Sequence, residues 1–109
     1  MNLFSSSALS KPLKAKLAKL ARLFKSKNQN LKTALEETRI VEAVKDPDLP
    51  LVEILVERNG SYHRVWLDPG NGKTYCSCPL YRKLKTCHHS LKVALLYEIR
   101  RLKWKTVST

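Results

Sequence analysis

The sequence has few acidic residues, no long apolar run and few cysteines. Among its 109 residues, 9 Asp and Glu stand against 21 Lys and Arg, which gives a formal net charge of +12 at pH 7. No apolar run approaches the ~18 residues of a membrane-spanning helix, so the sequence predicts a soluble protein. Hydrophobic residues make up 43% of the chain, which is too many for a disordered protein.

The 3 cysteines exclude a closed disulfide framework, because one thiol would stay unpaired. All of them lie between residues 76 and 87, whereas small secreted scaffolds spread their cysteines to join distant segments. We therefore expect a reduced, intracellular protein of the cytoplasm, nucleoid or nucleus. Residues 1–17 lack the apolar segment of a secretion signal. They are Ser-rich and acid-poor, as transit peptides are, but their positive charge comes from Lys, which weighs against organelle targeting.

Sets of residues that enzymes need are also missing. The sequence shows no nucleophile–base–acid combination, no phosphate-binding glycine loop and no paired carboxylates beside a candidate site. Most of the acids lie in residues 33–68, away from the cysteines. We therefore expect a binding protein and not an enzyme.

The positive charge is concentrated at the two ends of the chain. Residues 1–32 contain eight Lys and Arg and no acid, residues 33–68 contain four basic and eight acidic residues, and residues 69–109 contain nine basic residues and one acid. Nucleic acid is the first expected partner of such charge and an anionic membrane surface the second. A lysine-rich helix can also be a merely solvated face, but the absence of acids in residues 1–32 favours nucleic acid.

Residues 10–27 are predicted to form a basic amphipathic helix. Ser10 is a suitable N-cap, and Pro12 falls in the first turn, where a missing N–H is tolerated. Five apolar side chains recur at helical spacing and form a Leu/Phe stripe: Leu9, Leu13, Leu17, Leu20 and Phe24. Core packing is the expected role of this stripe, and docking on a partner helix or a membrane are the alternatives.

An antiparallel meander is predicted for residues 51–58, 61–68 and 73–78. Asn59-Gly60 is a strong hairpin signal, and residues 68–72 provide a second turn. Residues 38–46 favour a strand, with a helix nearly as plausible. The two turns predict the pairs Val52–Leu67, Ile54–Val65, Val56–His63, Leu67–Thr74, Val65–Cys76 and His63–Cys78.

One face of this meander is apolar, and residues 87–104 are predicted to cover it as a helix capped by Thr86. The apolar stripe of that helix contains Leu91, Leu95, Ile99 and Leu102. On the opposite sheet face, Trp66 and Tyr75 are expected to lie side by side, near Tyr62 and Arg64. These aromatic residues either stack single-stranded bases or pack beneath the N-terminal helix, and we favour the second interpretation.

The spacing of Cys76, Cys78, Cys87 and His89 indicates a metal site. Residues i and i+2 of a strand share a face, so two thiols point together, and the other two residues fall where the helix begins. Three Cys and one His form a standard tetrahedral zinc set that leaves no open position, so one structural Zn²⁺ is expected. A redox pair or an iron–sulfur cluster explains these residues less well. His88 is the alternative fourth ligand, and His63 is expected beside the site, not in it.

The pattern Cys-x-Cys-x₈-Cys-x-His, with its "CSCP" start, resembles the SWIM zinc finger across roughly residues 51–100. The resemblance implies a ββα arrangement around one zinc ion, with Cys76, Cys78, Cys87 and His89 as ligands. Such domains occur in chromatin-remodelling ATPases, Mutator-type transposases, certain kinases and proteins that accompany recombinase paralogs, where they bind DNA or proteins. Many members have a small residue three positions after the histidine. Lys92 stands there in this chain, which weighs against the recombination-accessory branch.

The sequence therefore predicts an α+β protein, with a basic helical arm in residues 1–30 and a SWIM-like zinc domain in residues 31–109. Its expected function is zinc-dependent binding of nucleic acid, DNA more than RNA, without strong base specificity. The alternative is a protein-interaction adaptor that docks through the Leu/Phe stripe on an enzyme of DNA recombination, repair or transcription. The candidate nucleic-acid contacts are Lys11, Lys14, Lys16, Lys19, Arg22, Lys25, Arg82, Lys83, Lys85, Arg100, Arg101 and Lys103.

Overall fold

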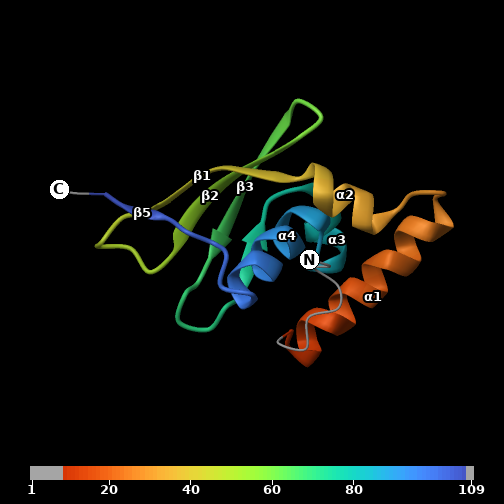
Figure 1. Ribbon diagram of the computed structural model, residues 1–109, viewed down its shortest axis with the longest axis horizontal. Coiled ribbons are helices and arrows are strands. Elements are labelled where there is room, and N and C mark those ends of the chain that lie inside the picture. The colour runs from red at the N-terminus through yellow and green to blue at the C-terminus, as the bar shows by residue number, and fades with distance from the viewer. Residues whose placement is uncertain (1–8, 108–109) are drawn as a thin grey trace.

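The computed structural model describes residues 9–107, which form an α+β fold with a five-stranded sheet on one side and helices on the other (Figure 1). Residues 1–8, at the start of the segment weighed as a transit peptide, lie outside this range. The elements follow in the order α1 (Lys11–Ser26), α2 (Leu31–Glu37), β1 (Arg39–Lys45), β2 (Val52–Arg58), β3 (Ser61–Leu67), β4 (Thr74–Cys76), α3 (Pro79–Leu84), α4 (His88–Glu98) and β5 (Lys105–Thr106).

The N-terminal helix forms as predicted. Ser10 is its N-cap, where the Ser10 Oγ accepts a hydrogen bond from the Leu13 N–H, and the helix ends just before Asn28, which has a positive φ of 56°. The whole Leu/Phe stripe is buried, and it packs with apolar residues of α2 and α4 in one cluster. The stripe therefore serves the core, as expected, and is not an exposed docking surface.

The sheet has the strand order β4-β3-β2-β1-β5. The Asn59-Gly60 turn has positive φ angles of 52° and 83°, as a type I′ hairpin requires. Five of the six predicted pairs are present between β2 and β3 and between β3 and β4. The sixth, His63–Cys78, is absent because β4 ends at Cys76 and the chain turns into α3.

Helix α4 lies between the sheet and α1, as Figure 1 shows. Val93 packs with the buried residues of the sheet, whereas Leu91 and Leu95 pack with α1 and α2. The two hydrophobic clusters therefore meet on one short helix, whose N-terminal end also carries part of the cysteine–histidine cluster.

Residues 39–45 form β1, as the favoured interpretation predicted. Other features differ from the predictions. Residues 79–84, for which no helix was predicted, form α3. The C-terminal helix ends at Glu98, because Arg100 adopts a left-handed conformation with φ 60° and closes a Schellman turn. The following residues include β5, which pairs in parallel with the end of β1.

Candidate metal centre and basic surface

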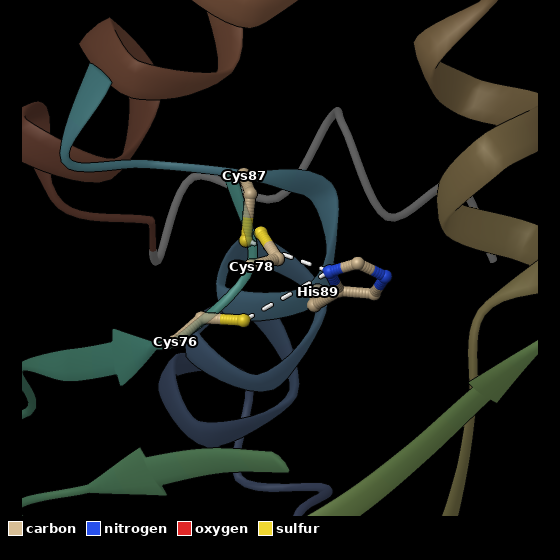
Figure 2. A group of neighbouring side chains, drawn as sticks. All are labelled: Cys76, Cys78, Cys87 and His89. Atoms are coloured by element: carbon tan, nitrogen blue, oxygen red, sulfur yellow. Dashed lines mark hydrogen bonds between the residues drawn. The ribbon is translucent and has the colours of Figure 1, made fainter. Parts of the chain in front are cut away.

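Each of the four predicted ligands lies at the end of an element. Cys76 is the last residue of β4, Cys78 is the N-cap of α3, Cys87 is the N-cap of α4, and His89 lies in the first turn of α4. All four residues are buried. Figure 2 shows the three thiols and the imidazole converging on one point from these separate segments.

Two of the cysteines also cap helices. The Sγ of Cys78 accepts a hydrogen bond from the Tyr81 N–H, and the Sγ of Cys87 accepts one from the Ser90 N–H. The Ser90 Oγ in turn accepts a hydrogen bond from the Cys87 N–H, and the two hydrogen bonds form a capping box. Thr86 was expected in this role. Cysteine is not among the usual N-cap residues, so no sequence signal indicated that Cys87 would cap this helix.

The distances between the four ligand atoms fit tetrahedral coordination of one ion. All four ligand atoms lie within 4.8 Å of one another, and the His89 Nδ1 is 3.9 Å from the Cys76 Sγ and 3.7 Å from the Cys87 Sγ (Figure 2). Zinc bonds to sulfur and nitrogen place tetrahedral donor atoms about 3.6–3.8 Å apart. The Cys₃His cluster is therefore positioned to bind one zinc ion, and zinc would hold β4, α3 and α4 together.

The pKa values of the three thiols indicate that their ionised forms need a compensating positive charge. A hydrogen bond with Cys87 lowers the pKa of Cys76, and the same interaction, together with burial, raises the pKa of Cys87 to about 12. Burial raises the pKa of Cys78. Three adjacent buried thiols cannot all ionise on their own, because each thiolate disfavours the next, whereas a divalent ion compensates their charge.

The two other histidines have distinct positions. The His63 ring lies 4.1 Å from the His89 ring, so His63 contacts a ligand. His88 contributes no atom to the described cluster, and its ring makes an edge contact with Phe24 at 5.8 Å. Burial, followed by the proximity of His89, lowers the pKa of His88 to about 3, so this side chain is neutral.

All twelve candidate nucleic-acid contacts are exposed. Six lie on α1, on the surfaces that the buried stripe leaves open, and three lie at α3 and its C-cap. The remaining three follow α4, in a segment that is not helical. These residues thus come from three separate segments of the chain.

The aromatic pair on the second sheet face forms as predicted, since Trp66 lies opposite Tyr75. The interpretation that we favoured, burial beneath the N-terminal helix, is wrong, because α1 packs against α2 and α4. Tyr75 is 41% exposed, and Trp66 is half-buried beside a hollow that Leu49 and Val107 also line.

Within residues 9–107, no helix has the length and apolar character needed to cross a membrane. In comparisons with known proteins, residues 62–98 match the family model of the SWIM zinc finger. No curated protein and no solved structure shows a significant match. The family match covers all four predicted ligands, and together with the converging cluster it confirms the resemblance: residues 62–98 carry a SWIM zinc finger whose Cys₃His set is positioned for one zinc ion.

Proposed function

We propose that this protein binds nucleic acid through the phosphate backbone, DNA in preference to RNA and with little base specificity, inside the cell at the nucleoid or nucleus. The zinc ion stabilises the fold that carries the basic surface and takes no part in a reaction. Phosphate contacts of this kind give affinity without sequence information. The preference for DNA rests on the resemblance to a module found in DNA-transacting proteins.

One observation carries the proposal: the cations of α1 are exposed and not neutralised by carboxylates. The three ion pairs between described residues use arginines of the middle segment, Arg39, Arg58 and Arg64. No Lys or Arg of α1 has a described carboxylate within ion-pair distance. These charges are therefore available for phosphates, and each contact would release counterions.

The test is a titration of labelled single- and double-stranded oligonucleotides with zinc-loaded protein at several salt concentrations, followed by fluorescence anisotropy. We expect log affinity to fall linearly with log salt, with a slope of about −0.9 per phosphate contact on a duplex. The double variant Lys14→Glu/Lys19→Glu should weaken binding and flatten this slope. Lys27→Glu/Lys32→Glu has the same net charge and changes exposed lysines outside the candidate set, so it serves as the control.

A slope near zero, or equal losses in both double variants, would contradict the proposal. In the first case the charge would be incidental. In the second, net charge and not the α1 surface would govern binding.

A second candidate function is binding of a protein partner. One exposed apolar surface supports it. Leu49 is 57% exposed and Val107 is 44% exposed, and both border a hollow of about 420 Å³ beside Trp66. Exposed apolar residues around a hollow are typical of interaction sites. This surface would replace the Leu/Phe stripe, which is buried. A stable stoichiometric complex that survives Lys14→Glu/Lys19→Glu but not Leu49→Asp would support this function.

A further inference from the structure

A cleft of about 520 Å³ opens between α1, the β3–β4 turn and α4. Three lysines line it, one from each of three separate segments: Lys16 of α1, Lys73 of the turn, and Lys85, the C-cap of α3. Lys16 and Lys85 were predicted as contacts in different basic stretches, and Lys73 was not among the candidates. The fold brings all three to one concave site.

The charge balance of this cleft is positive. None of the three lysines forms an ion pair with a described residue. Glu98 also lines the cleft, but its two carboxylate oxygens accept hydrogen bonds from the N–H and the Oγ–H of Ser10, at 2.7 and 2.8 Å. This carboxylate ties the start of α1 to the end of α4, and the three lysines that line the same cleft outnumber it.

The cleft also has a polar group without a partner. Thr86 lines it, is 3% exposed, and its buried Oγ1 has no hydrogen-bond partner among the described residues. A buried hydroxyl without a partner costs free energy, and a bound oxyanion would supply the missing acceptor. Thr86 directly precedes the ligand Cys87, so one wall of the cleft is continuous with the metal centre.

We propose that this cleft binds a phosphomonoester group. Several cations gathered in a hollow match a dianion better than the single charge of a backbone phosphodiester. The molecule that carries this group, in agreement with the proposed function, is a nucleic-acid strand with a terminal phosphate. Only this choice of molecule rests on the proposed function. The other source of the same chemistry is a free small phosphate.

The first experiment uses methyl phosphate as the probe and the zinc-loaded full chain, with amide chemical shifts recorded by NMR at matched ionic strength. We expect saturable shifts at Lys73 and Thr86 and an affinity about tenfold lower in Lys73→Gln, since a charge-assisted contact is lost. Lys32→Gln, which changes an exposed lysine outside the cleft, should keep the wild-type affinity. Shifts that do not saturate, or equal losses in both variants, would overturn the proposal.

The variant Thr86→Val separates binding from structure. It keeps the shape of the side chain and removes the hydroxyl, so we expect weaker methyl phosphate binding with an unchanged or higher Tm. A lower Tm with unchanged affinity would show that the hydroxyl is structural, and would overturn its assignment to the ligand.

Oligonucleotides of one sequence, with and without a 5′-phosphate, then identify the source. We expect the phosphorylated strand to bind more tightly and this difference to vanish in Lys73→Gln. If oligonucleotides bind equally whatever their ends and methyl phosphate does not bind, the cleft proposal fails while the proposed function stands. If methyl phosphate binds and oligonucleotides do not, the proposed function fails and the cleft is a site for small phosphates.

Discussion

The ring of His63 lies against the ring of the metal ligand His89, with centroids 4.1 Å apart and planes inclined by 33°. His63 belongs to β3 and His89 to α4, so this contact joins the sheet directly to the metal centre. Burial, followed by the charge of His89, lowers the pKa of His63 and keeps it neutral beside the site. His63 therefore packs against a ligand and contributes no atom to the described cluster.

Replacing His63 should weaken the metal site without abolishing it. In His63→Ala we expect one zinc ion per chain, bound about tenfold more weakly, because residues that orient a ligand tune its affinity. His63→Phe keeps a ring at this position and should retain most of the affinity. Competition with a chromophoric chelator measures both values. Loss of zinc stoichiometry in His63→Ala would instead make His63 a ligand.

Removal of zinc should unfold at least the C-terminal part of the protein. Structural zinc sites contribute apparent binding free energies of about 10–16 kcal/mol in small domains, and the ligands of this site come from three segments, the end of β4, the start of α3 and the start of α4. We expect Cys87→Ser to lose bound zinc and its cooperative thermal transition, as the wild type does in EDTA. Ser77→Ala changes an exposed residue between two ligands and is the control. Metal analysis and circular dichroism provide the readouts.

The N-terminal helix should contribute to global stability. Leu20 of α1 has no exposed surface and packs in the cluster with α2 and α4. Leu20→Ala should lower the free energy of unfolding by about 2–5 kcal/mol, through lost burial and the cavity left behind. Lys19→Ala, at the exposed neighbour, should change it by about 0.5 kcal/mol or less. Urea denaturation measures both. An equally small effect at Leu20 would mean that α1 is not docked in solution.

Glu57 should make the stability of the β2–β3 hairpin depend on pH. Its Oε2 accepts a hydrogen bond from the Gly60 N–H and its Oε1 pairs with Arg39, and these contacts lower its pKa. A carboxyl whose pKa is lowered by folding adds stability above its unfolded pKa, and this stability is lost as pH falls through the folded value. Glu57→Gln should therefore lower Tm at pH 7 and match the wild type below the folded pKa.

The control for this prediction is Glu42→Gln, which changes an exposed carboxyl of β1 that forms no hydrogen bond or ion pair with another described side chain. A constant difference in Tm between Glu57→Gln and wild type across pH would show that the carboxylate charge is not responsible.

The sequence predicted those features that short-range chemistry determines. Asn59-Gly60 favours positive φ angles, so it fixed the register of β2 and β3 and placed Val65 opposite Ile54. The spacing of the four ligands identified the metal cluster for a similar reason, because thiols two residues apart can share one centre. Leu20 and its stripe were assigned to the core because their periodicity matches one helix face.

Other features depend on contacts between distant segments. The end of α4 escaped prediction because Arg100 occupies the left-handed position where Gly is the usual signal. The two residues of β5 pair with the end of β1 across a long stretch of sequence, and no local pattern marks them. The cleft was missed for the same reason, since Lys16, Lys73 and Lys85 come together only in the folded chain.

The position of α4 has a consequence for how the protein opens. Its residues belong to both hydrophobic clusters, and its first turn carries a metal ligand. Neither cluster can therefore separate from α4 without exposing an apolar face of this helix to water. The amide hydrogens of Val93, Ala94 and Leu95 should exchange with solvent only when the entire molecule opens, which makes this short helix the slowest-exchanging segment of the chain.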